Sequence, residues 1–203
     1  ANNTIVVLWS DHGWQLGEKK HWRKFALWEN VNRSVLMIQA PQIEKKLPSG
    51  AKTGNAESLV SLIDIYPTLI DLCELPKRDD LDGESLLPLL KEPLTEIERP
   101  IITTYDYGSY SVRYQKWHFI KYIDDSKELY NLESDPEEWT NLASDSDYEN
   151  TILKLDAFIP KNTVDLPLSS LIELQEHHIA PIQSKEHYES IERKEWMKRF
   201  DNL

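Results

Sequence analysis

The chain has 203 residues, a length that suits one domain or one domain with a small second one. Its formal net charge of −12, from 35 acidic and 23 basic side chains, excludes a general nucleic-acid binder, because such proteins need a basic surface to neutralise phosphates. A single cysteine excludes an internal disulfide, and no apolar run approaches the ~20 residues of a membrane-spanning helix.

The first predicted element is a strand over residues 5–9, Ile-Val-Val-Leu-Trp. Its β-branched residues are apolar on both faces, which predicts a central strand covered on both sides. The polar turn Ser-Asp-His-Gly at residues 10–13 ends it. Ligands of open α/β sheets bind just past the carboxyl ends of strands, so Asp11 and His12 stand where such a fold places a site. Basic and aromatic residues follow and indicate a site that holds a metal and an anion together: Trp14, Lys19, Lys20, His21, Trp22, Arg23 and Lys24.

The next elements alternate between helices, strands and loops. We expect a short helix over 25–32, a second buried strand over 35–38, and a Pro- and Gly-containing loop over 41–56. Asp64 is predicted to cap a helix that has Pro67 in its first turn. A further helical turn is expected over 85–90.

The C-terminal half has a β pattern after a charged linker between Pro93 and Pro100. Alternating short segments predict an antiparallel sheet with one face in solvent, with strands at 101–105, 110–114, 117–122 and 128–130. A helix is expected over 146–159, and an exposed helix over 184–200. The predicted division is therefore an α/β portion at 1–99, a small antiparallel-sheet subdomain with a helix at 100–160, and a C-terminal extension at 161–203.

Four motifs occur in an order typical of one enzyme family. They are SDHGW at 10–14 with LGE at 16–18, Trp22 and Lys24; DIYPTL at 64–69; LDGESL at 81–86; and ELYNL at 128–132 with DPEEWTNL at 135–142. Together they resemble the second half of a formylglycine-dependent sulfatase, in the iduronate-sulfatase-like branch of the alkaline phosphatase superfamily. The likeness covers roughly residues 4–160. It implies an α/β, alkaline-phosphatase-like sulfatase fold, of which this is the C-terminal part, with a small C-terminal antiparallel sheet plus a helix.

The resemblance also shows what the chain lacks. The family's nucleophile is a formylglycine made from the Cys or Ser of a Cys/Ser-x-Pro/Ala-x-Arg motif, whereas Cys73 lies in Leu-Cys-Glu-Leu. The family's paired metal-binding aspartates near the N-terminus are missing too. We therefore interpret the chain as the C-terminal half of a sulfatase, separated from the half that bears the nucleophile. Alone, it is expected to be inactive.

The resemblance assigns roles to residues of the first motif. Asp11 is the predicted metal ligand, against a turn-capping aspartate, since calcium takes carboxylate oxygens. His12 is predicted to be a ligand or a direct neighbour of the sulfate; by residue type alone, an Asp-His pair would suit zinc or manganese as well. Lys24 matches the lysine that holds the sulfate group, and its alternative is a solvated surface lysine.

Other residues have weaker assignments. His21 is a candidate proton donor that could equally face solvent, and Trp14 either stacks on a sugar or fills core. Gly17, Glu18 and Trp22 are expected to brace the loop. Arg113, Tyr107 and Tyr110 are candidates to approach the substrate from the C-terminal sheet, and His118, His177 and His178 show no ligand spacing.

The predicted function of the intact protein is that of a sulfuric ester hydrolase acting on a sulfated carbohydrate, with Ca²⁺ as the metal and formylglycine in the missing half. One alternative is a phosphate mono- or diester hydrolase of the same superfamily. Another is a non-catalytic split or remnant module that binds a glycan or a partner chain. The expected partners are a sulfated sugar and either the missing N-terminal half or a second copy, because a cut sheet leaves an open edge. The resemblance implies a periplasmic, secreted or lysosomal protein.

Overall fold

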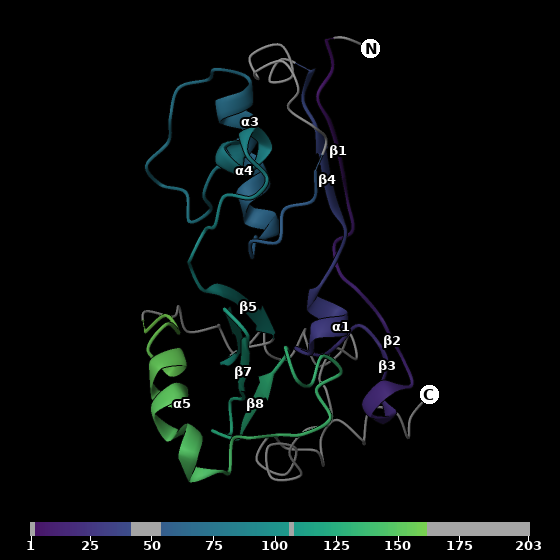
Figure 1. Cartoon of the computed structure of the whole chain (residues 1–203), viewed down its shortest axis with the longest axis vertical. Helices are drawn as coiled ribbons and strands as arrows, with labels where there is room; N and C mark the ends of the chain where they lie inside the picture. Colours follow the sequence, from purple (N-terminus) through teal and green to yellow (C-terminus); the bar gives the residue numbers. More distant parts are fainter. Residues whose placement is uncertain (1–2, 42–53, 106–107, 162–203) are drawn as a thin grey trace, which may run out of the picture.

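The computed structural model describes residues 3–41, 54–105 and 108–161. The loop predicted at 41–56 lies largely outside these residues, as do the helix predicted at 184–200 and the side chains of Tyr107, His177 and His178. Figure 1 shows a long two-stranded ribbon beside two helices at one end of the molecule, and a four-stranded sheet with its own helix at the other. No helix of the described residues is long and apolar enough to cross a membrane.

The ribbon consists of β1 (Val6–Trp9) and β4 (Leu36–Gln39), which pair antiparallel with Val7 opposite Ile38. One face packs against α3 (Ile65–Leu72) and α4 (Leu87–Lys91) (Figure 1). This small core combines the residue before β1, one residue of β4, the residue after it and residues of both helices: Ile5, Ile38, Ala40, Leu69, Leu72, Leu87 and Leu90.

The other face of the ribbon is partly exposed, although the sequence predicted a strand covered on both sides. Val6, Leu8, Val35 and Met37 are each about half exposed. The physical reason is that β1 and β4 are both edge strands of a two-stranded sheet, and the helices of the described residues cover one face alone. An apolar sheet face is therefore left uncovered.

Asp64 occupies the N-cap of α3, as predicted, but its carboxylate does not cap that helix. It is fully buried and accepts the backbone N–H groups of Ser61 (2.7 Å) and Glu84 (2.9 Å), and it pairs with Arg99. Thr68 extends the connection, since its Oγ1 accepts the N–H of Leu86 at 2.8 Å. Hydrogen bonds thus join the DIYPTL motif to the LDGESL motif, and we call this connection a clasp.

The second unit is a four-stranded antiparallel sheet in the order β5-β6-β7-β8, which confirms the predicted C-terminal sheet. Its strands are β5 (Ile101–Tyr105), β6 (Ser109–Tyr114), β7 (Trp117–Lys121) and β8 (Lys127–Asn131). The predicted helix over 146–159 forms a 3₁₀ turn, η3 (Ser146–Tyr148), followed by α5 (Glu149–Asp156). Ile152 and Leu155 of α5 pack against Val112, Phe119 and Leu129 of the sheet.

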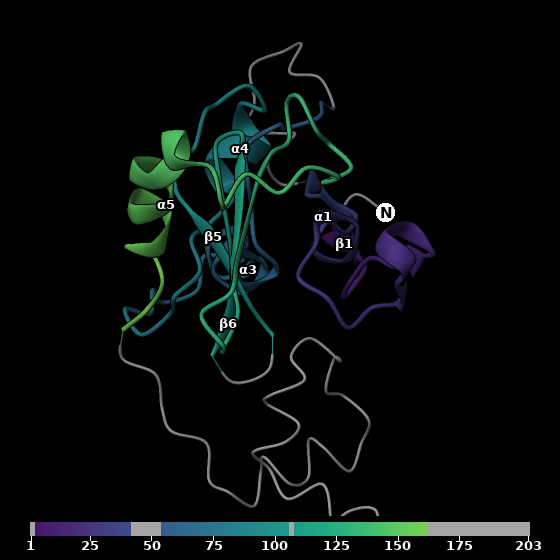
Figure 2. The same cartoon turned by 90° about the horizontal axis from the view of Figure 1, so that it is seen from below.

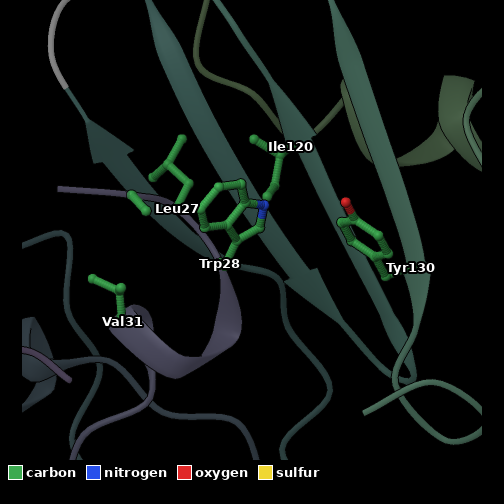
Figure 3. Close-up of a cluster of buried hydrophobic side chains, with 6 residues drawn as sticks. Leu27, Trp28, Val31, Ile120 and Tyr130 are labelled. Carbon is green, nitrogen blue, oxygen red and sulfur yellow. The ribbon is translucent and has the colours of Figure 1, made fainter. Parts of the chain in front are cut away.

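The prediction that this sheet has one face in solvent is wrong. Viewed from below, α5 lies on one side of the sheet and α1 (Glu29–Asn32) on the other (Figure 2). Leu27, Trp28 and Val31 pack there against Ile120 and Tyr130 (Figure 3). The same packing explains why the helix predicted over 25–32 begins only at Glu29: Leu27 and Trp28 are held in the core, and Trp28 has extended backbone angles.

The DPEEWTNL motif forms a turn that is fixed to β8. The Asp135 carboxylate accepts the N–H groups of Trp139 (2.9 Å) and Thr140 (2.7 Å). Asn141 accepts the N–H of Leu129 at 3.0 Å and donates to the carbonyl of Lys127 at 3.1 Å. This motif therefore satisfies backbone groups at the sheet edge and at the turn.

Candidate functional site

The loop that follows β1 is held against α1 by its backbone. Gly13 N–H donates to the carbonyl of Val31 (2.7 Å), and Trp14 N–H donates to that of Asn30 (3.0 Å). A Cβ on Gly13 would lie 1.9 Å from the carbonyl oxygen of Asn30, so the approach requires a residue without a side chain. This close docking fixes where Asp11 and His12 stand.

Asp11 and His12 lie side by side at the end of this strand. His12 Nε2 is 3.4 Å from Asp11 Oδ2, and the carboxylate is largely exposed. His12 Nδ1 is 2.6 Å from the carbonyl oxygen of Gly13, which can only accept a hydrogen bond, so Nδ1 carries the proton. Nε2 therefore faces the carboxylate, and a ring whose Nδ1–H is bonded to a backbone carbonyl has the orientation of a metal-ligating histidine.

Two donor groups do not complete a metal site. Within the described residues no group of three or more His, Cys, Asp and Glu side chains gathers. Asp11 and His12 fit a divalent cation as two of its ligands, and further ligands would have to come from outside the described part of the chain. The carboxylate suits calcium, whereas the imidazole also suits manganese or zinc.

Trp14 lies beside this pair. Its ring centroid is 6.0 Å from that of His12, with the planes tilted by 31°, and the side chain is about half exposed. An indole with an open face next to a metal and anion site can stack on a sugar ring. The structure therefore brings Asp11, His12 and Trp14 together.

A tight hairpin follows, formed by β2 (Gln15–Leu16) and β3 (Trp22–Arg23) around the 3₁₀ turn η1 (Glu18–Lys20). Four of its residues adopt the left-handed backbone region: Gly17, Lys19, Lys20 and Arg23. Glu18 braces the turn, because its carboxylate accepts the N–H of Leu16 at 2.6 Å, and this bond lowers the pKa of Glu18. Trp22 packs over Gly17 and is otherwise exposed.

Lys24 and His21 differ in their surroundings. Lys24 is partly exposed, with Nζ 5.8 Å from the ring centroid of Phe25, and no carboxylate in the described part of the chain pairs with it. Its charge is therefore open to an anion. His21 instead contacts the core: its ring meets Trp28 edge-on at 5.6 Å, and its buried Nε2 has no hydrogen-bond partner among the described residues.

Sequence reasoning missed the network around Lys19. Lys19 Nζ donates to Tyr130 Oη at 2.8 Å and lies 4.2 Å and 5.0 Å from the ring centroids of Tyr130 and Trp28. Glu128 Oε2 accepts from both Tyr130 (2.6 Å) and Trp28 Nε1 (2.8 Å). Burial lowers the pKa of Lys19 and, with the hydrogen bond to Glu128, raises that of Tyr130. The only signal in the sequence is the strand alternation that places Glu128 and Tyr130 on one face of β8.

The candidates from the C-terminal sheet have structural partners. Arg113 donates to Glu29 of α1 at 3.0 Å and to the carbonyl of Trp117 at 2.8 Å, and it is mostly buried. Tyr110 is partly buried within β6. His118 is fully buried and hydrogen-bonded at both ring nitrogens, which agrees with the structural role expected for it.

Comparison with known proteins gives a consistent result. A family model described as N-sulphoglucosamine sulphohydrolase, C-terminal, matches residues 17–164. A protein named Sulfatase from Formosa agariphila is 34% identical over 179 residues, covering 88% of this chain and 34% of that protein. Arylsulfatase K from Bos taurus is 33% identical over 156 residues, covering 70% of this chain and 28% of that protein. The chain thus spans about a third of the length of these relatives.

Solved structures share the fold. BT4656, described in complex with its substrate D-glucosamine-2-N,6-O-disulfate, has a TM-score of 0.65 and 23% identity over 86% of this chain and 34% of that one. The phosphonate monoester hydrolase of Agrobacterium radiobacter has a TM-score of 0.58 and 23% identity over 87% of this chain and 36% of that one.

Proposed function

Because the chain belongs to the sulfatases, as their C-terminal part, we propose that the whole protein hydrolyses sulfate esters on a carbohydrate. The observation that carries this proposal is the Asp11–His12 pair. The Asp11 carboxylate and His12 Nε2 stand 3.4 Å apart just after the end of β1. Calcium is the proposed metal, and a bound divalent cation would polarise the sulfate ester.

Lys24 and Trp14 complete the proposed substrate contacts within this chain. The ammonium group of Lys24 would bind a sulfate oxygen and stabilise the charge that develops there. The open face of Trp14 would stack on the sugar that carries the sulfate. His21 remains the proposed proton donor, but its Nε2 is buried against Trp28, so it would have to rotate to reach a substrate.

The other components lie outside this chain. The nucleophile, a formylglycine, is proposed to come from a segment that the family's longer members carry. The uncovered face of the ribbon, with Val6, Leu8, Val35 and Met37, is the proposed contact for the rest of the sulfatase. Burying an apolar face of this kind is favourable by ~25 cal/mol per Å². In its absence, the same face would favour association between two copies of the chain.

The proposed division at residues 99 and 160 and a periplasmic, secreted or lysosomal location also remain proposals. A sulfated sugar is the proposed substrate class, which agrees with the glucosamine disulfate complex of BT4656. Titrating the longer protein that contains this chain with calcium by calorimetry tests the metal proposal, because Asp11 and His12 supply only part of the ligand set. Asp11→Asn should abolish the binding; binding that is unchanged in this variant would contradict the assignment.

Activity requires a second experiment. We expect the 203-residue chain alone to leave an aryl sulfate intact, whereas a longer protein that contains it should hydrolyse that ester. Steady hydrolysis of the aryl sulfate by the isolated chain would contradict the proposal that the nucleophile lies outside this chain. A longer protein that binds sulfated glycans without any turnover would favour the non-catalytic module.

The likeness to a phosphonate monoester hydrolase supports a second candidate, a phosphate ester hydrolase. The two share a tetrahedral anionic substrate, which a metal and Lys24 would bind in either case. The ratio of kcat/KM for aryl sulfate to that for aryl phosphate, measured on the longer protein, separates them. A ratio well above one supports the sulfatase proposal.

A further inference from the structure

A buried hydrogen-bonded chain links Ser111, His118 and Glu138 in the C-terminal sheet. Ser111 Oγ lies 2.6 Å from His118 Nε2, and His118 Nδ1 is bonded to Glu138 Oε1. The order serine, histidine, acid matches that of hydrolase triads, which are recognised by geometry. Here, however, each of the three residues is at most 2% exposed. No substrate can reach Ser111, so the constellation does not act as a nucleophile.

The second carboxylate oxygen of Glu138 points to α1. Glu138 Oε2 accepts the backbone N–H of Glu29, the first residue of this helix, at 2.9 Å. Glu138 itself has a φ of 59°, a left-handed value that costs free energy for a residue with a side chain. The fold therefore holds a strained residue in place so that its two oxygens reach His118 and α1.

Two further contacts hold α1 to the same sheet. Asn32 Nδ2 donates to Ser111 Oγ at 3.3 Å, and Arg113 Nε donates to Glu29 Oε2 at 3.0 Å. The next two residues of α1 after Glu29 are Asn30 and Val31, whose carbonyls face the site loop. These accept the N–H groups of Trp14 and Gly13, the residues directly after His12.

We propose that His118 and Glu138 are positioning residues: they fix α1 on the sheet, and α1 in turn fixes the Asp11–His12 loop. Glu138 uses one oxygen for the Nδ1–H of His118 and the other for Glu29 N–H. Removing this carboxylate frees the first turn of α1 and loosens the carbonyls that hold Gly13 and Trp14. A role of this loop in metal binding rests on the proposed function, whereas the hydrogen-bonded connection from Glu138 through α1 to the loop does not.

The test is amide hydrogen exchange, followed by NMR, on the ¹⁵N-labelled 203-residue chain. In Glu138→Ala, protection of the Gly13 and Trp14 amides should fall by about tenfold or more, relative to the Phe119 amide of the central strand, because a charge-assisted buried hydrogen bond is lost. Asn141→Ala is the matched control. It removes hydrogen bonds from the same turn, but to β8 and not to α1, so it should leave that ratio unchanged.

A conservative variant separates positioning from general damage. Glu138→Gln keeps one oxygen for Glu29 N–H and offers its amide N–H to His118 Nδ1, with the ring in the other tautomer. It should restore most of the Gly13 protection. The proposal would be overturned if Glu138→Ala and Asn141→Ala lost equal protection at the Gly13 and Trp14 amides. It would also be overturned if Glu138→Gln lost as much of this protection as Glu138→Ala. If the alanine variant does not fold, Glu138→Asp applies the same test, because its shorter side chain cannot reach both donors.

Calcium affinity, measured by calorimetry on the longer protein with the same substitutions, adds the functional readout. Glu138→Ala should weaken binding by about fivefold or more, whereas Asn141→Ala should not. If the unmodified longer protein binds no calcium, the proposed metal site fails, and the exchange pattern still decides whether Glu138 positions the loop.

Discussion

Replacing Gly13 with alanine tests the close docking of the site loop on α1. The added Cβ would meet the Asn30 carbonyl oxygen at 1.9 Å and the Arg33 carbonyl oxygen at 3.1 Å. Since Cβ contacts under 3.0 Å essentially do not occur, the two backbone segments must separate by at least ~1 Å. This breaks two hydrogen bonds worth ~0.5–1.5 kcal/mol each and adds ~1–3 kcal/mol of overpacking. The free energy of unfolding should therefore fall by about 2–6 kcal/mol.

Urea unfolding of the 203-residue chain, followed by circular dichroism, measures this loss, and calcium calorimetry on the longer protein with the same substitution measures its local effect. Gly83→Ala is the matched control, since its Cβ would meet the Ile63 carbonyl oxygen at 2.3 Å, far along the chain from Asp11 and His12. Both variants should lose stability, but only Gly13→Ala should lose calcium affinity. A Gly13→Ala variant within ~0.5 kcal/mol of the unmodified protein would refute the reasoning.

Three further predictions concern buried ionic groups and the sulfate-binding lysine. Arg99→Met should lower the free energy of unfolding, measured by thermal unfolding, by about 3–5 kcal/mol, because it leaves the fully buried Asp64 without its cation. The double variant with Asp64→Asn should recover part of this loss. No recovery would contradict the attribution of the loss to the unpaired Asp64 carboxylate. The pKa of Tyr130 is raised in the folded state by burial and by Glu128, so its contribution is complete below the unfolded value near 10 and is lost at higher pH. The free energy of unfolding of the unmodified chain should therefore fall more steeply above about pH 10 than that of Tyr130→Phe. Urea unfolding of both proteins from pH 8 to 11 measures this, and the same pH dependence in both would count against the hydrogen-bond network. In the longer active protein, Lys24→Ala should lower kcat/KM for an aryl sulfate by about 10²–10³-fold, and a change below threefold would exclude a role in sulfate binding.

Local sequence patterns predicted most of the elements, because their causes are local. The alternation of β5 to β8 and the short apolar stretch of β1 were visible directly, and each formed a strand. The errors came from contacts between distant segments. Trp28 reaches Glu128, 100 residues further on, and this packing shortened α1 and covered the sheet face predicted to be in solvent. Tertiary burial overrode helix propensity there.

For the site residues too, the sequence predicted local neighbours but not contacts between distant segments. Asp11, His12 and Trp14 could be predicted as neighbours because they lie within five positions after the end of β1 at Trp9. The surroundings of Lys19 and His118 could not, because their partners lie on other strands and turns: Tyr130 is 111 residues from Lys19 in the chain. His118 lacked any ligand spacing, and its burial gives it a different role, in holding α1.

The motifs that identify the family also differ in what they do. Asp64 and the LDGESL segment form one set of hydrogen bonds, and Asp135 and Asn141 form another, so these residues satisfy buried or edge backbone groups, whereas Glu138 of the DPEEWTNL motif bonds α1. Among the described residues, the SDHG turn carries the pair proposed to bind a metal, Asp11 and His12, and Lys24 is the residue proposed to bind the anion. A related chain could therefore keep both sets of hydrogen bonds and the fold while losing catalysis. Activity has to be judged at Asp11, His12 and Lys24, together with the part of the protein that supplies the nucleophile.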